Sequence, residues 1–209
     1  MLKLYYAPAT CALAAHIALE DIGAPFEAVA VDFASAEQTK PAYKAINPKA
    51  RVPALVGDRG TLTEVPAILA YLAQTNPQAN LAPLNNPFEF ARMQAFNSYL
   101  CSTVHVAHAH KGRGTRWVDD PAAIEAMKKK VTQNMAACFE LIEQHLFTAP
   151  WVLGAAYSVA DPYLFTLTRW LEGDGVEVKQ FPGVAAHFGR MFERPAVKRA
   201  LHAQGLPGG

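Results

Sequence analysis

Short runs of alternating hydrophobic and polar positions fill residues 1–75, and the period changes repeatedly between that of a strand and that of a helix. Residues 2–6 and 26–31 alternate as strands do, residues 11–22 and 65–75 have a helical period, and residues 41–45 allow a short helix. Residues 52–63 predict a hairpin around a Gly-Asp-Arg-Gly turn. This order of elements predicts a small mixed sheet that is flanked by helices.

The pattern changes at residues 76–87, where prolines and asparagines interrupt both periods. Beyond this segment we find helical periods alone, over residues 88–110, 122–146, 159–171, 183–194 and 196–204. We therefore predict an α/β domain over residues 1–78 and an all-α domain over residues 87–209. Ser158 and Asp161 form a capping-box pattern, so we interpret Asp161 as a structural residue whose cap interaction contributes about 1 kcal/mol.

The composition narrows the function classes. A hydrophobic share of 51% among 209 residues argues against disorder, and a net charge of +1 gives no global attraction to nucleic acid or to an anionic membrane surface. No apolar run reaches the length of a membrane span. The three cysteines form no paired motif, so we expect a reducing compartment such as the cytoplasm.

Cys11 stands where the first strand gives way to a helix. The N-terminus of a helix stabilises a thiolate, and ligands of α/β sheets bind outside the carboxyl ends of the strands. The alternative is that Cys11 is a small buried apolar residue. The residue three positions further on is Ala14, which disfavours a dithiol oxidoreductase.

Two further features belong to the same end of the predicted sheet. Pro53 stands near the start of a strand, where its neighbour Val52 can offer backbone groups to an extended peptide. Glu64 precedes a helix that begins at Val65, so a side-chain carboxylate and free N–H groups together suit a zwitterionic ligand. Each feature alone is as easily explained by ordinary turn and helix-end chemistry, but their combination with Cys11 favours a binding site.

Four motifs carry a resemblance to a known family: KLYYAPATC at residues 3–11, INPKARVPAL at 46–55, LTEVPAILAYL at 62–72 and SVADPYLFTL at 158–167. In this order they resemble bacterial glutathione S-transferases of the beta class, over nearly the whole chain. The resemblance implies a thioredoxin-like N-terminal domain, an all-helical C-terminal domain and a homodimer. It also implies that glutathione is the co-substrate.

The resemblance also implies site residues. Cys11 would lie beside the glutathione sulfur and could form a mixed disulfide with it. Val52, before a cis Pro53, would pair with the cysteinyl part, and Glu64 with Val65 would bind the γ-glutamyl end. Three further contacts would come from one helix: Ser98, Ser102 and His105. Of these, His105 would reach the glutathione site across the dimer interface.

Three departures from the family pattern predict weaker glutathione binding. Val65 replaces a serine or glycine, the loop at residues 33–36 lacks a lysine, and Val106 follows His105 where a lysine is common. His105 and His108 share a helical face, but no third ligand accompanies them, so we expect no metal. Residues 111–116 are interpreted as a flexible break at the mouth of an electrophile pocket, whose lining we expect to include Phe33, His108, Trp117 and Trp170.

These features predict a detoxifying transferase that joins the glutathione thiol to a small apolar electrophile. A glutathione-dependent thiol reductase or isomerase is the first alternative. A non-catalytic adaptor with the same fold is the second, although such a protein could dispense with Cys11 and Glu64.

Overall fold

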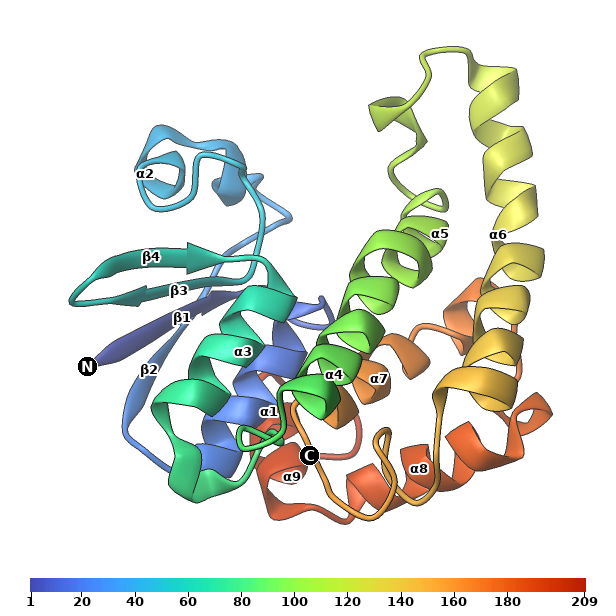
Figure 1. Cartoon of the computed structure of the whole chain (residues 1–209). Helices are drawn as coiled ribbons and strands as arrows, with labels where there is room; N and C mark the ends of the chain where they lie inside the picture. The colour runs from blue at the N-terminus through green and yellow to red at the C-terminus, as the bar shows by residue number, and fades with distance from the viewer.

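The computed structural model describes all 209 residues and consists of a four-stranded sheet with its helices, followed by a helical domain (Figure 1). The strands lie in the order β2-β1-β3-β4. β1 is parallel to β2 and antiparallel to β3, which is in turn antiparallel to β4. The strand bounds are β1 Leu2–Tyr6, β2 Phe26–Ala30, β3 Ala54–Gly57 and β4 Gly60–Thr63.

The N-terminal domain contributes α1 (Ala12–Ile22), α2 (Pro41–Lys44) and α3 (Val65–Thr75). The helical domain contains α4 (Pro87–Tyr99), α5 (His105–Ala109), α6 (Pro121–Leu141), α7 (Ala160–Thr168), α8 (Pro182–Phe192) and α9 (Pro195–Ala203). The predicted fold class, an α/β thioredoxin-like domain followed by an all-α domain, is therefore confirmed. Between α3 and α4 lies one short 3-10 turn, Pro77–Ala79, and the exact limits 1–78 and 87–209 stay predictions.

β3 begins two residues later than the sequence pattern predicts. Pro53 has no N–H to donate to a neighbouring strand, so regular pairing starts at Ala54. The Val52–Pro53 peptide bond is cis, as the family resemblance implies.

The predicted helix over residues 88–110 is continuous but not uniform. α4 passes into a π-helical stretch at Leu100–Val104, and α5 follows directly with His105 as its first residue. A π-helical turn holds an extra residue, so it changes the direction in which the following side chains point. The sequence pattern predicts one continuous helix here and does not reveal the π-helical stretch.

α1 is buried on every side, although the sequence suggests a helix with one apolar face. Every residue from Ala12 to Leu19 is buried, including the polar His16. The helix is enclosed because α3 packs against it within the first domain while α7 and α9 pack against it from the second. His16 meets its partner Gln204 across this junction at 3.0 Å. The N-terminus of α1 is thereby fixed at the boundary between the two domains.

Asp161 is a structural residue, as predicted, but its carboxylate contacts more parts of the chain than a helix cap requires. Its Oδ2 accepts the Ser158 N–H at 2.7 Å, which is the expected capping contact. Its Oδ1 accepts the backbone N–H of Val152 at 2.8 Å and lies 3.0 Å from Nε2 of His187 on α8. Since Asp161 is fully buried, we expect its loss to cost more than the value of about 1 kcal/mol for a simple cap.

None of the helices is both long and apolar enough to cross a membrane. No group of three or more histidine, cysteine, aspartate or glutamate side chains is arranged to hold a metal ion. His108, one of the two histidines on the predicted helical face, instead pairs with Asp174.

Candidate functional site

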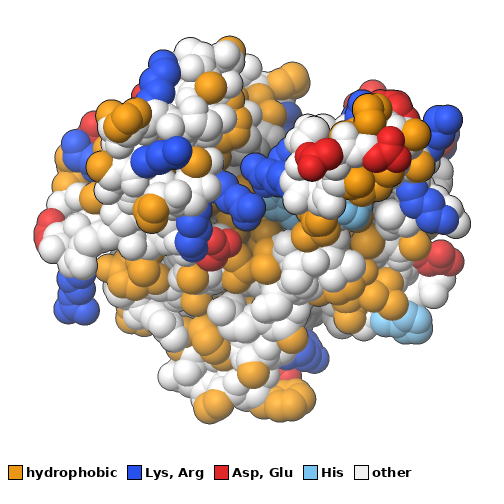
Figure 2. All heavy atoms as spheres, turned by 90° about the horizontal axis from the view of Figure 1, so that it is seen from above, with side chains coloured by type: hydrophobic (Ala, Val, Ile, Leu, Met, Phe, Trp, Pro, Cys, Tyr) orange, Lys and Arg blue, Asp and Glu red, His pale blue; other side chains and the backbone are white.

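A cavity of about 700 Å³ lies between the two domains. Its N-terminal wall comes from the loop before α1, the segment before β3 and the junction of β4 with α3, and its other wall from α5, the loop after α5 and α7. Figure 2 shows the hollow from above, with Lys and Arg side chains gathered at its rim from both sides and histidines deeper within it. Predicted site residues that line it are Cys11, Val52, Pro53, Glu64, Val65 and His105, with Phe33, His108, Trp117 and Trp170.

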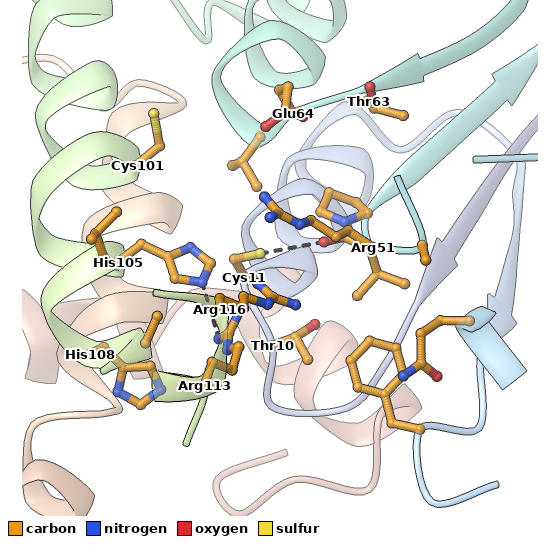
Figure 3. A pocket seen from close by; sticks show the side chains of 18 of the residues that line it. Thr10, Cys11, Arg51, Thr63, Glu64, Cys101, His105, His108, Arg113 and Arg116 are labelled. Atoms are coloured by element: carbon orange, nitrogen blue, oxygen red, sulfur yellow. Dashed lines mark hydrogen bonds between the residues drawn. The ribbon is translucent and has the colours of Figure 1, made fainter. Parts of the chain in front are cut away.

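Cys11 lies at the bottom of this cavity and is only 7% exposed. It is the residue directly before α1, and its Sγ donates a hydrogen bond to the Val52 carbonyl at 3.6 Å (Figure 3). Burial raises the pKa of the Cys11 thiol to about 12, and the Arg113 guanidinium opposes this rise only in part. The expectation that the helix N-terminus stabilises a Cys11 thiolate is therefore wrong for the glutathione-free protein, because desolvation outweighs the helix dipole.

We expect Cys11 to resist alkylation at pH 7 because a neutral, buried thiol reacts slowly. Cys101 lines the same cavity and is more exposed, so it provides an internal reference. Iodoacetamide followed by peptide mass spectrometry should therefore label Cys101 before Cys11. Faster labelling of Cys11 would contradict the buried, neutral state of this thiol.

His105 and Arg113 face Cys11 from the helical domain (Figure 3). Arg113 Nη2 lies 3.4 Å from His105 Nε2, and because a guanidinium only donates, Nε2 accepts and the ring proton is on Nδ1. Burial lowers the pKa of His105 to about 3, with Arg113 adding to the effect. His105 is therefore a neutral imidazole. It lines the cavity of its own chain, so its access to the site does not require a partner subunit.

A set of contacts fixes the wall behind His105. The His108 ring stacks on Trp170 with centroids 4.3 Å apart, and His108 Nδ1 lies 2.7 Å from the buried Asp174 carboxylate. Trp170 Nε1 donates to the Ala9 carbonyl at 3.0 Å. The loop before Cys11 is thus tied directly to the helical domain.

Glu64 adopts a strained backbone conformation at the rim of the cavity. Its φ of 70° lies in the left-handed region, which is rare for a residue other than glycine and is found mainly at functional sites. Its Oε1 pairs with Lys49 Nζ at 2.6 Å. No side chain caps the helix that begins at Val65, so the N–H groups of its first turn are available to an anion.

Two predicted residues lie elsewhere. Ser98 and Ser102 are exposed and do not line the cavity of this chain. Their contact with glutathione stays a prediction.

Three arginines line the site although the sequence motifs predict no role for them. Arg51, Arg113 and Arg116 all line the cavity, and Figure 3 shows them around Cys11. Arg51 could have been noticed because it directly precedes Val52. Arg113 and Arg116 belong to residues 111–116, which the sequence suggested only as a flexible break at the pocket mouth.

Comparisons with known proteins agree with this geometry. The family models "Glutathione S-transferase, N-terminal domain" and "Glutathione S-transferase, C-terminal domain" match residues 1–74 and 114–190. The glutathione S-transferase GstA of Escherichia coli O157:H7 is 35% identical, covering 98% of this chain and 100% of its own. A glutathione transferase homologue from Sulfitobacter, crystallised with bound glutathione, is 45% identical with a TM-score of 0.95 over 99% of both chains.

A beta-class glutathione S-transferase from Sphingomonas chungbukensis is 35% identical, with a TM-score of 0.85 over 98% of this chain and 99% of its own. The thioredoxin-like domain, the helical domain and the cavity between them are the architecture that both family models and these solved structures describe. On this evidence the chain belongs to the glutathione S-transferase family, and the resemblance seen in its sequence is confirmed.

Proposed function

We propose that this protein is a glutathione transferase that joins the glutathione thiol to an electrophile held in the cavity between its domains. The proposal rests on one observation: Cys11, Val52 and Glu64 all line the same wall of the cavity. These residues match a thiol partner, a backbone partner and an ammonium partner for the tripeptide. The bound glutathione in the Sulfitobacter homologue supports the same co-substrate here.

The two ends of glutathione would be bound by different groups. The Glu64 carboxylate binds the γ-glutamyl ammonium, and the uncapped first turn of α3 binds the adjacent carboxylate. Arg51, directly before Val52, is the candidate partner for the glycine carboxylate. This arginine takes over the role of the lysine that is missing from residues 33–36.

The Val52 carbonyl connects binding to thiol chemistry. In the free protein it accepts the Cys11 S–H. When the cysteinyl N–H of glutathione pairs with the same carbonyl and the glutathione sulfur lies beside Cys11, the Cys11 S–H turns to donate to that sulfur. Cys11 then acts as a neutral donor that stabilises the glutathione thiolate.

Arg113 supplies the positive charge that the glutathione thiolate requires. It contacts His105 and lies close enough to Cys11 to lower its pKa. His105, with a pKa of about 3, is too weak a base to keep a proton at neutral pH, so the thiol proton leaves to water. Catalysis thus combines a lowered thiol pKa with proximity of the thiolate to the electrophile.

The alternatives suggested by the sequence are less well supported. A glutathione-dependent reductase that attacks a disulfide through Cys11 needs the Cys11 thiolate, whereas burial raises the pKa of this thiol. An adaptor has no use for the complete set of groups around the cavity.

We further propose a cytoplasmic homodimer. Ser98 and Ser102 would contact glutathione from the partner subunit, because both are exposed and neither lines the cavity of its own chain. Detoxification of electrophiles is the role that such an activity supports.

Replacing Glu64 by glutamine is expected to weaken glutathione binding by about 1.5–3 kcal/mol, the range for a hydrogen bond to a charged group. Isothermal titration measures the effect. Glu27→Gln is a matched control, because Glu27 also pairs with a lysine, Lys3 at 2.7 Å, but lies on β2 outside the cavity. Equal affinities of the two variants would remove Glu64 from the site.

The proposed activity itself is tested by glutathione titration and by turnover of 1-chloro-2,4-dinitrobenzene with glutathione. We expect saturable binding and an enzyme-dependent rate. A protein that neither binds glutathione nor accelerates this reaction would refute the proposal.

A further inference from the structure

The cavity holds more positive charge than its own side chains neutralise. Arg51, Arg113 and Arg116 line it, and none of them forms an ion pair with a carboxylate. The acidic residue in the lining, Glu64, is already paired with Lys49. Like charges that face one another across a cavity repel, so the arrangement favours anions that enter it.

Glutathione accounts for two of these arginines. In the proposed function Arg51 binds its glycine carboxylate and Arg113 stabilises its thiolate. Arg116 has no group of glutathione to bind. Partial desolvation and the charges of Arg113 and Arg51 lower the pKa of the exposed Arg116. This side chain therefore lies in the same positive field with no compensating anion.

Arg116 belongs to the aromatic side of the cavity. It ends the 3-10 turn Gly114–Arg116 and is followed by Trp117, whose ring meets that of His110 edge to face with centroids 4.5 Å apart. Phe33 contributes a second exposed ring from the other domain. A flat electrophile would contact these rings while its substituent reaches the guanidinium.

We propose that the electrophile carries a carboxylate, which Arg116 binds while the ring or alkene of the same molecule lies against Trp117. This inference rests on the proposed function and replaces the purely apolar electrophile expected from the sequence with an anionic one. Arg116 acts in substrate selection and takes no part in thiol activation.

A matched pair of aryl chlorides tests the proposal: 4-chloro-3-nitrobenzoate and its methyl ester. In both, the glutathione thiolate attacks the ring carbon that bears chlorine, a C–S bond forms, the C–Cl bond breaks and chloride leaves. The carboxyl group is unchanged. Each kcat/KM is divided by the rate constant of the uncatalysed reaction with glutathione, which corrects for the different reactivities of acid and ester.

We expect the wild-type protein to favour the acid over the ester by about tenfold, the lower end of the range for a contact between charged groups, because Arg116 is exposed. Arg116→Gln should remove this preference by lowering turnover of the acid much more than turnover of the ester. Arg59→Gln, which removes an exposed arginine outside the cavity, should retain the preference. Added salt should lower the acid rate more than the ester rate.

The possible outcomes separate this inference from the proposed function. Turnover of both compounds with no preference for the acid, or a preference that survives in Arg116→Gln, would overturn the inference and leave the transferase intact. Absence of glutathione binding and of turnover with either compound would refute the transferase itself.

Discussion

Replacing Arg113 by glutamine is expected to raise the pKa of the enzyme-bound glutathione thiol by about 1–2 units, because a neighbouring opposite charge typically lowers a pKa by about 1–3 units. At pH values below the wild-type pKa of the bound thiol, the thiolate fraction then falls about 10- to 100-fold, and kcat/KM falls with it. The pKa of the bound thiol must rise and not fall, because loss of a cation disfavours the negatively charged thiolate. The loss of activity should therefore shrink as pH rises and disappear above the pKa of the variant.

Ultraviolet absorbance of the thiolate in the enzyme–glutathione complex, followed against pH, measures this shift directly. Arg113→Lys retains the charge and should restore most of the effect, although it loses the planar donor that contacts His105. If the thiol pKa is the same in wild type and Arg113→Gln, Arg113 has no role in activation.

Replacing Asp161 by alanine is expected to lower the free energy of unfolding by about 3–5 kcal/mol, because several buried donors lose their acceptor and each costs about 1–3 kcal/mol. The substitution leaves the Val152 and Ser158 N–H groups and His187 without their buried acceptor. Denaturation by urea, followed by circular dichroism, measures the loss.

Asp120→Ala is the matched control for this experiment. Asp120 is also a helix-capping aspartate, but it is exposed and accepts one hydrogen bond, from the Ala122 N–H at 3.1 Å. Its loss should cost about 1 kcal/mol. Similar costs for the two substitutions would show that Asp161 is no more than a cap.

Local patterns account for the parts of the fold that the sequence predicts well. The strand β1 and the helix α3 occupy exactly the predicted residues, because alternation and a first-turn proline are properties of neighbouring residues. The enclosure of α1 could not be predicted in this way. Its second apolar side is covered by α7 and α9, which are far away in the sequence.

The same distinction explains the errors at the site. The sequence places Cys11 correctly before a helix, but its protonation state depends on burial by both domains. Arg113 and Arg116 look like part of a solvated break, and only the packing of the loop after α5 against the cavity directs their side chains toward Cys11. Residue type and spacing can predict that a cysteine belongs to the site. The charged groups that surround its thiol are set by tertiary structure.

The position of the glutathione sulfur tests the central claim most directly, and a crystal structure of the protein soaked with glutathione would show it. We expect the sulfur beside the Cys11 Sγ, on the side that faces His105 and Arg113, with the cysteinyl backbone paired to Val52. Glutathione bound with its sulfur pointing away from Cys11, or a cavity that stays empty in saturating glutathione, would contradict the account.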